Sequence, residues 1–120
     1  MSNKGETFGA TVRQLREEKK IGLRKFARIV GMSPAYLSKV ERDAFAPPAE
    51  DKIRAIADAL DQDADELLAL AGRVSSELAA IIRRRPREIA TFLRAANGLP
   101  ADEMQHLAEE ARRLKKDEGT

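Results

Sequence analysis

LRKFARIVGMSPAYLSKVER, residues Leu23 to Arg42, carries a pattern of apolar residues that predicts two short helices joined by a tight turn. Gly31 stands where the first helix should end, a position that commonly needs a positive φ. Ser33 is a good N-cap for the second helix, and Pro34 suits its first position because no N–H is needed there. The two apolar faces, which are expected to pack together, consist of Phe26, Ala27 and Val30 in the first helix and Leu37 and Val40 in the second.

Helical patterns continue on both sides of this pair. Thr7 can cap a helix before it, and a connector over residues 44–48, which ends in two prolines, leads to the next pattern. Asp63 or Asp65 can cap a further short helix. The inward faces of these three helices are expected at Phe8, Val12 and Leu15, at Ile53, Ile56, Ala57 and Leu60, and at Leu67, Leu68 and Leu70.

The composition excludes several classes of protein. The 120 residues are rich in helix-forming Ala, Leu, Glu, Arg and Lys, which favours an all-α chain. No 20-residue apolar stretch and no secretory leader are present, so we expect no membrane association and a cytoplasmic location. Because the chain has no cysteine, disulfides and thiolate metal sites are excluded. Met1 to Glu6 is polar and is expected to be a disordered arm.

Catalytic chemistry finds little support in the sequence. The single histidine, His106, lies off the apolar stripe of its segment and is expected at the surface. Neither a glycine-rich phosphate loop nor a His-Glu-x-x-His motif is present. We therefore expect no catalytic residue, no metal and no cofactor, and we do not expect an enzyme.

The net charge of +2 conceals an uneven distribution. Residues 1–42 hold ten Lys or Arg against four Asp or Glu, whereas residues 43–72 hold two against eight. A basic face of this kind attracts a phosphate backbone by neutralising charge and releasing counterions. The residues that would form it are Lys19, Lys20, Arg24, Lys25, Arg28, Lys39 and Arg42.

Gly72 ends the first half, and three further helical patterns follow in residues 73–120. Pro86 restarts the chain after the first of them, and Pro100 opens the third. Helices of this length are marginal in water, so their apolar faces must be buried against another surface. We expect a second copy of the chain, or else a different protein, to bind a surface formed by Leu78, Ile82, Phe92, Leu93, Leu107 and Leu114.

Four arginines cluster where the first two of these patterns meet, at Arg83, Arg84, Arg85 and Arg87. They could extend a nucleic-acid contact or bind an acidic partner. We favour a simpler interpretation, in which positive charge at the end of a helix complements its dipole and stays solvated.

The residues GMSPAYLSKVER, 31–42, together with the flanking helices, resemble the Cro and phage-repressor (XRE) family of helix-turn-helix DNA-binding domains. The resemblance extends over residues 8–70 and implies an all-α chain with a five-helix, lambda-repressor-like domain. The sequence departs from the family pattern at Leu23, where the family often has glutamine, and at Asp43, where it usually has glycine. Aspartate tolerates the left-handed conformation better than most residues, so the turn at Asp43 should survive.

The same resemblance assigns roles to individual residues. Arg16 should form an ion pair with Glu41, near the end of the recognition helix, unless both are ordinary surface charges. Lys39 is the leading base-contacting residue because its ammonium can donate to guanine O6 and N7, although a phosphate contact is the alternative. The other two base-contacting positions are Pro34 and Ala35, which could touch a thymine methyl group.

Phosphate contacts are expected from the N-terminal ends of the helices and from basic or polar side chains near them. Tyr36 could instead pack at the edge of the domain. The candidates are Arg24, Lys25, Tyr36, Ser38 and Arg42.

The sequence therefore predicts a DNA-binding domain in residues 1–72 and a helical dimerisation or partner-binding region in residues 73–120. The expected function is that of a transcriptional regulator, a homodimeric repressor that reads a palindromic double-stranded DNA operator through the major groove. The alternative is an antitoxin or a partner-switched regulator whose C-terminal helices bind another protein, such as a toxin or a metallopeptidase.

Overall fold

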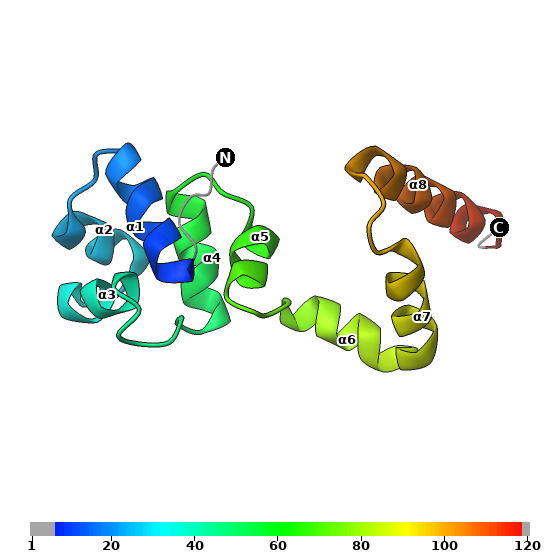
Figure 1. The fold of residues 1–120 in the computed structure, drawn as a ribbon, viewed down its shortest axis with the longest axis horizontal. Coiled ribbons are helices and arrows are strands. Elements are labelled where there is room, and N and C mark those ends of the chain that lie inside the picture. The colour runs from blue at the N-terminus through cyan, green and yellow to red at the C-terminus, as the bar shows by residue number, and fades with distance from the viewer. Residues whose placement is uncertain (1–6, 119–120) are drawn as a thin grey trace. The chain divides into compact units, whose positions relative to one another are not determined.

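The computed structural model describes residues 7–118, and all regular structure in this range is helical (Figure 1). The predicted all-α class, five helices followed by a helical C-terminal region, is confirmed. The predicted arm, Met1 to Glu6, lies outside the described residues. The helices of the described range are α1 (Phe8–Glu18), α2 (Leu23–Val30), α3 (Pro34–Glu41), α4 (Glu50–Ala59), α5 (Ala64–Leu70), α6 (Ser76–Arg84), α7 (Pro86–Ala96) and α8 (Ala101–Glu118).

Helices α1, α3 and α5 begin where a side chain satisfies a free N–H group of the first turn. The hydroxyl of Thr7 accepts a hydrogen bond from the Ala10 amide at 3.1 Å. The Ser33 hydroxyl accepts from the Tyr36 amide, also at 3.1 Å. Asp63, one of the two predicted caps for α5, accepts from an amide of the first turn at 3.0 Å. Each such cap contributes about 1 kcal/mol, so local sequence defines these starts.

The core lies among the first five helices, where α3 packs on α1 and α2, and α4 packs on α2 and α5 (Figure 1). Phe26 and Leu37, predicted to face each other across the turn, are both fully buried. Burying side chains of this size contributes roughly 1.5–3 kcal/mol each. Gly31 joins α2 to α3 with a φ of 74°, the left-handed conformation predicted for it.

The start of α1 meets the end of α3 in a close contact that the sequence pattern did not reveal. Asp43 has a φ of 61°, so the chain turns sharply after α3. The Thr7 hydroxyl donates to the Asp43 carboxylate at 2.7 Å. Gly9 lies so close to this turn that a Cβ on it would be 2.2 Å from the Val40 carbonyl oxygen. A glycine is therefore needed at this position for steric reasons rather than for its φ.

The chain divides into two compact units, and the boundary between them in the sequence lies between Leu78 and Ala79. The segment after α5 is tied to the first unit, because the Arg73 guanidinium donates to the carbonyls of Pro47 and Pro48 at 2.9 and 2.6 Å. The proposed domain limits, residues 1–72 and 73–120, stay a prediction.

The second unit is built differently from the first. Among residues 79–117, Ala96 is the one buried residue, whereas the larger apolar side chains of α7 and α8 are exposed or half-buried. In the described part of the chain, no helix is both long enough and apolar enough to cross a membrane.

We expect Gly9→Ala to destabilise the full chain by about 1–3 kcal/mol, because the added Cβ forces the α1 backbone away from the end of α3. Urea unfolding followed by circular dichroism measures this loss. Gly22→Ser is the control, because a Cβ at Gly22 meets nothing within 4 Å and serine is at least as good an N-cap as glycine. Equal stability of the two variants would contradict the proposed close contact.

Candidate nucleic-acid interface

Helix α3 turns one side to the core and presents the other at the surface of the first unit. The three predicted base-contacting residues, Pro34, Ala35 and Lys39, are all exposed. Ala35 and Lys39 are one helical turn apart, so their side chains leave the helix on the same side. The buried residues of the helix are Leu37, Val40 and Glu41.

Lys39 does not stand alone on this surface. Its ammonium nitrogen lies over the ring of Phe45, 5.0 Å from the ring centroid. The Tyr36 ring packs against the same Phe45 ring, with 5.7 Å between centroids. Tyr36 therefore packs against an aromatic neighbour at the edge of the domain, and its predicted phosphate contact stays a prediction. Phe45 was not singled out from the sequence, because it lies in the connector after α3, where helical periodicity carries no information.

A hollow of about 200 Å³ opens at the start of α2. Among its lining residues, Arg13 from α1 and Arg42 from the end of α3 bring positive charge to it, and Ser38 adds a hydroxyl. Arg42 is positioned by donating its Nε–H to the Ser38 carbonyl at 3.3 Å. Leu23, the first residue of α2, lines the same hollow together with the paired Arg16 and Glu41. Three arginines against one glutamate leave a net positive charge beside a helix N-terminus that favours anions.

Of these lining residues, Ser38 and Arg42 were predicted to contact phosphate, and Arg13 was not. Arg13 also contacts Glu17 at 3.1 Å within α1, an exposed i,i+4 pair. Its place beside the start of α2 depends on how α1 packs on α3, which a helical pattern alone does not specify.

The other basic candidates occupy the exposed side of α2. Arg24 and Lys25 lie in its first turn, and Arg28 follows one turn later; all three are exposed. Lys19, in contrast, forms an ion pair with Asp61 at 2.7 Å, so one charge of the predicted basic face is offset by the acidic segment. The positive charge at this surface thus comes from the basic residues of α2 and α3 together with Arg13 and Arg42.

The predicted pair of Arg16 and Glu41 lies beneath this surface. Arg16 donates twice to the Glu41 carboxylate, from Nε at 2.7 Å and from Nη2 at 2.9 Å. A third N–H of the same guanidinium donates to the Ile21 carbonyl at 2.8 Å. The two side chains are only 9% and 3% exposed, so this is a buried, bidentate pair. The hydrogen bond to Glu41 raises the pKa of the Arg16 guanidinium, against the opposing effect of burial.

The residues predicted to form a dimer or partner surface differ in exposure. Phe92, Leu93 and Leu114 are 50%, 54% and 60% exposed. Leu78 is also exposed, while Ile82 and Leu107 are half-buried. The arginine cluster, Arg83–Arg85 with Arg87, is exposed at the junction of α6 and α7.

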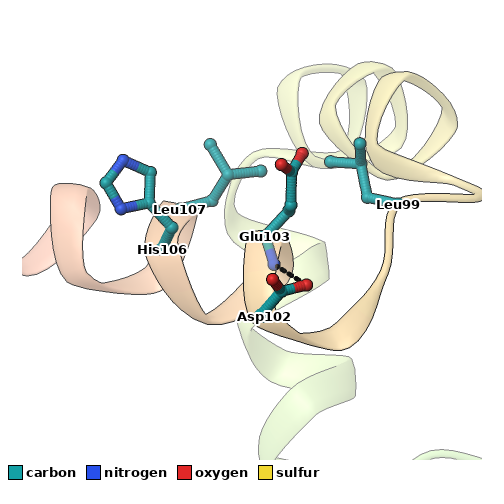
Figure 2. Close-up of a pocket in the computed structure, with 5 residues that line it drawn as sticks. All are labelled: Leu99, Asp102, Glu103, His106 and Leu107. Carbon is teal, nitrogen blue, oxygen red and sulfur yellow. Dashed lines mark hydrogen bonds between the residues drawn. The ribbon is translucent and has the colours of Figure 1, made fainter.

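The second unit also contains a surface hollow of about 390 Å³ around the first turns of α8, and Figure 2 shows the five side chains that line it. His106 is exposed, as predicted. Within residues 7–118, no three His, Asp or Glu side chains are grouped so that they could hold a metal ion. The hollow is lined by Leu99, Asp102, Glu103, His106 and Leu107.

Comparison with known proteins adds the following findings. The model of a helix-turn-helix domain family matches residues 7–70. No curated protein matches the chain. One similar solved structure is SinR, the master regulator for biofilm formation, in complex with DNA, with 29% identity over 52% of this chain and 98% of that chain and a TM-score of 0.48.

Two further solved structures are similar. The clp gene regulator ClgR from Corynebacterium glutamicum is 24% identical over 77% of this chain and 92% of its own, with a TM-score of 0.49. The SinR protein/SinI protein complex contains a chain that is 21% identical over 92% of this chain and 99% of its own, with a TM-score of 0.51. At that identity, the last likeness supports the fold alone.

We expect Arg16→Leu to lower the free energy of unfolding by about 3–5 kcal/mol, because it leaves the Glu41 carboxylate buried without a partner. The double variant Arg16→Leu/Glu41→Leu should recover part of that loss. Arg13→Leu is the control, since it breaks an exposed pair worth about 1 kcal/mol or less. Urea unfolding of the four proteins measures the differences, and equal losses for Arg16→Leu and Arg13→Leu would show that the buried pair contributes no more than a surface pair.

Proposed function

The chain belongs to the helix-turn-helix domain family, and from this premise we propose that it is a sequence-specific double-stranded DNA-binding transcriptional regulator. The observation that supports this function most directly is the outward side of α3, where Pro34, Ala35 and Lys39 are all exposed. Recognition helices of this kind enter the major groove with their N-terminal residues near the base edges. The cytoplasm, where it would meet its DNA, is the proposed location.

Lys39 is the main base-contacting residue. Its ammonium can donate to guanine O6 and N7, whereas Pro34 and Ala35 offer no side-chain hydrogen bond and can only contact a thymine methyl group. The expected half-site therefore contains a guanine opposite Lys39 and tolerates substitution elsewhere more readily.

Phosphate binding falls to the basic residues around α2. The hollow lies beside Leu23, at the start of α2, and its lining includes Arg13, Arg42 and Ser38. Arg24 and Lys25 add charge in the first turn of that helix. Arg13 and Arg42 thereby supply the phosphate contact that a glutamine at position 23 would make.

We further propose that the regulator is a homodimer formed through its second unit. The described part of that unit buries little apolar surface by itself, and Phe92, Leu93 and Leu114 are half exposed or more. The charges of α8 favour a second copy of the chain as the molecule that covers these side chains, because the first turn of the helix is acidic and its last turn is basic. Two copies packed antiparallel about a two-fold axis would place opposite charges together at both ends.

A two-fold dimer predicts a palindromic operator with half-sites about 10 base pairs apart, or a multiple of that spacing. Repression is the proposed mode of regulation, because a dimer bound at an operator excludes other proteins from that DNA. Occupying an operator is sufficient to block transcription.

The DNA-binding proposal is tested by selecting tight-binding duplexes from a random pool with the full chain, then measuring variants on the selected site. Lys39→Ala should weaken operator binding by about 1–3 kcal/mol and relax one base position. Arg24→Ala should weaken operator and random DNA alike and reduce the salt dependence by about one counterion. Arg54→Ala, which removes an exposed charge from α4 outside the proposed DNA and dimer surfaces, is the control. An equal loss on both DNAs for Lys39→Ala would reassign Lys39 to a phosphate.

The dimer proposal is tested by light scattering of the purified chain without DNA. We expect twice the chain mass of 13.3 kDa for the wild type and the single mass for Leu93→Arg, because a buried charge at the interface is costly. Ile29→Arg is the control, since Ile29 is 52% exposed but lies in α2, outside residues 73–120. A monomeric wild type would contradict self-association and favour a different protein as the occupant of the second unit.

A further inference from the structure

We infer that Phe45 determines DNA sequence specificity by acting through Lys39, whose ammonium it holds at a fixed place on the outward side of α3. This inference rests on the DNA-binding function proposed above. Phe45 itself belongs to the connector after the recognition helix, outside the three positions assigned to base contacts.

The backbone brings the connector back onto Lys39. Asp43 adopts a φ of 61°, which reverses the chain direction directly after α3. As a result, the Lys39 carbonyl accepts two hydrogen bonds, from the Ala44 amide at 2.9 Å and from the Phe45 amide at 3.2 Å. The main chain of Phe45 is thus fastened to the residue whose side chain its ring contacts.

The ring then completes the contact. The Lys39 ammonium lies 5.0 Å from the Phe45 ring centroid, within the range in which a cation is attracted to the face of an aromatic ring. Tyr36, one turn before Lys39 on α3, packs against the Phe45 ring, and the planes of the two rings are inclined by 46°. The Phe45 ring is therefore held between the helix and its own backbone.

Burial in the core does not explain this aromatic residue. Phe45 is 44% exposed, whereas Phe26 and Phe8 of the same unit are 0% and 4% exposed. An exposed phenylalanine beside an exposed lysine contributes little to stability, but it limits where the lysine ammonium can go. That limit matters for recognition, because lysine is otherwise a flexible chain with many rotamers.

A lysine whose ammonium is held in one place distinguishes base pairs better than a mobile lysine does. Donation to guanine O6 and N7 requires the ammonium at one point in the major groove, while attraction to phosphates requires only its charge. Loss of the uncharged Phe45 ring should therefore reduce discrimination between base pairs and leave the affinity for random DNA unchanged.

The contact itself is measured first, on the full chain without DNA. Protons above an aromatic face are shifted upfield, so the Hε resonances of Lys39, assigned with Lys39→Gln, should lie upfield of those of a solvated lysine. We expect Phe45→Leu to abolish this shift and Phe45→Trp, which keeps an aromatic face, to preserve it. An unchanged Lys39 shift in Phe45→Leu would overturn the inference.

Specificity is measured next, with the selected operator, its variant at the base pair opposite Lys39, and random-sequence DNA. Phe45→Leu should lower the discrimination between the first two by roughly two- to fivefold, the strength expected of an exposed cation–aromatic contact, and Phe45→Trp should restore it. In a Lys39→Gln background, Phe45→Leu should cause no further loss, because the ring acts through the lysine.

The other outcomes overturn the inference in separable ways. Unchanged discrimination in Phe45→Leu, despite loss of the Lys39 shift, would mean that the ring places the ammonium only in the free protein. An equal loss in the Lys39→Gln background would mean that Phe45 contacts DNA directly. If the wild type selects no DNA sequence, the DNA-binding proposal fails and the specificity role falls with it, while the resonance measurement still reports whether the contact exists.

Discussion

The buried pair of Arg16 and Glu41 is the interaction on which the proposed DNA-binding surface depends. It joins α1 to the last residue of α3 through two short hydrogen bonds, and the same guanidinium also binds the Ile21 carbonyl just before α2. Three parts of the domain are therefore held by one side chain. Because both charges are buried, separating them is costly, and α3 cannot rotate about its axis without breaking the pair. The outward position of Lys39 follows from that restraint.

A second restraint acts where the chain leaves the recognition helix. Asp43 takes a left-handed backbone conformation and accepts a hydrogen bond from Thr7, so the turn is anchored to the start of α1. Gly9 permits the close approach. The direction given to the connector places the Phe45 ring beside the Lys39 ammonium. Residues that are 36 positions apart in the chain thereby influence the surface that would meet a base pair.

The two units differ in how much of their apolar surface is buried. The first has a closed core around Phe26, Leu37 and Ile56, so it can hold side chains at fixed positions. The second keeps large apolar side chains such as Leu93 exposed, and the proposed association with a second copy would cover them. The basic surface of the first unit and the apolar one of the second are the two features on which the proposed DNA-binding dimer rests.

The sequence by itself determined the helices, their caps at Thr7 and Ser33 and the left-handed turn at Gly31, because these depend on residues within one or two helical turns. The resemblance of its motif to a known family also implied the Arg16 and Glu41 pair. Only the tertiary structure decided that Gly9 touches the end of α3, that Arg13 lines the hollow beside α2, and that Phe45 lies under the ammonium of Lys39. The first two join segments far apart in the chain, and the third depends on the backbone direction after Asp43. Periodicity records which face of a helix is buried, but not which distant residue that face meets.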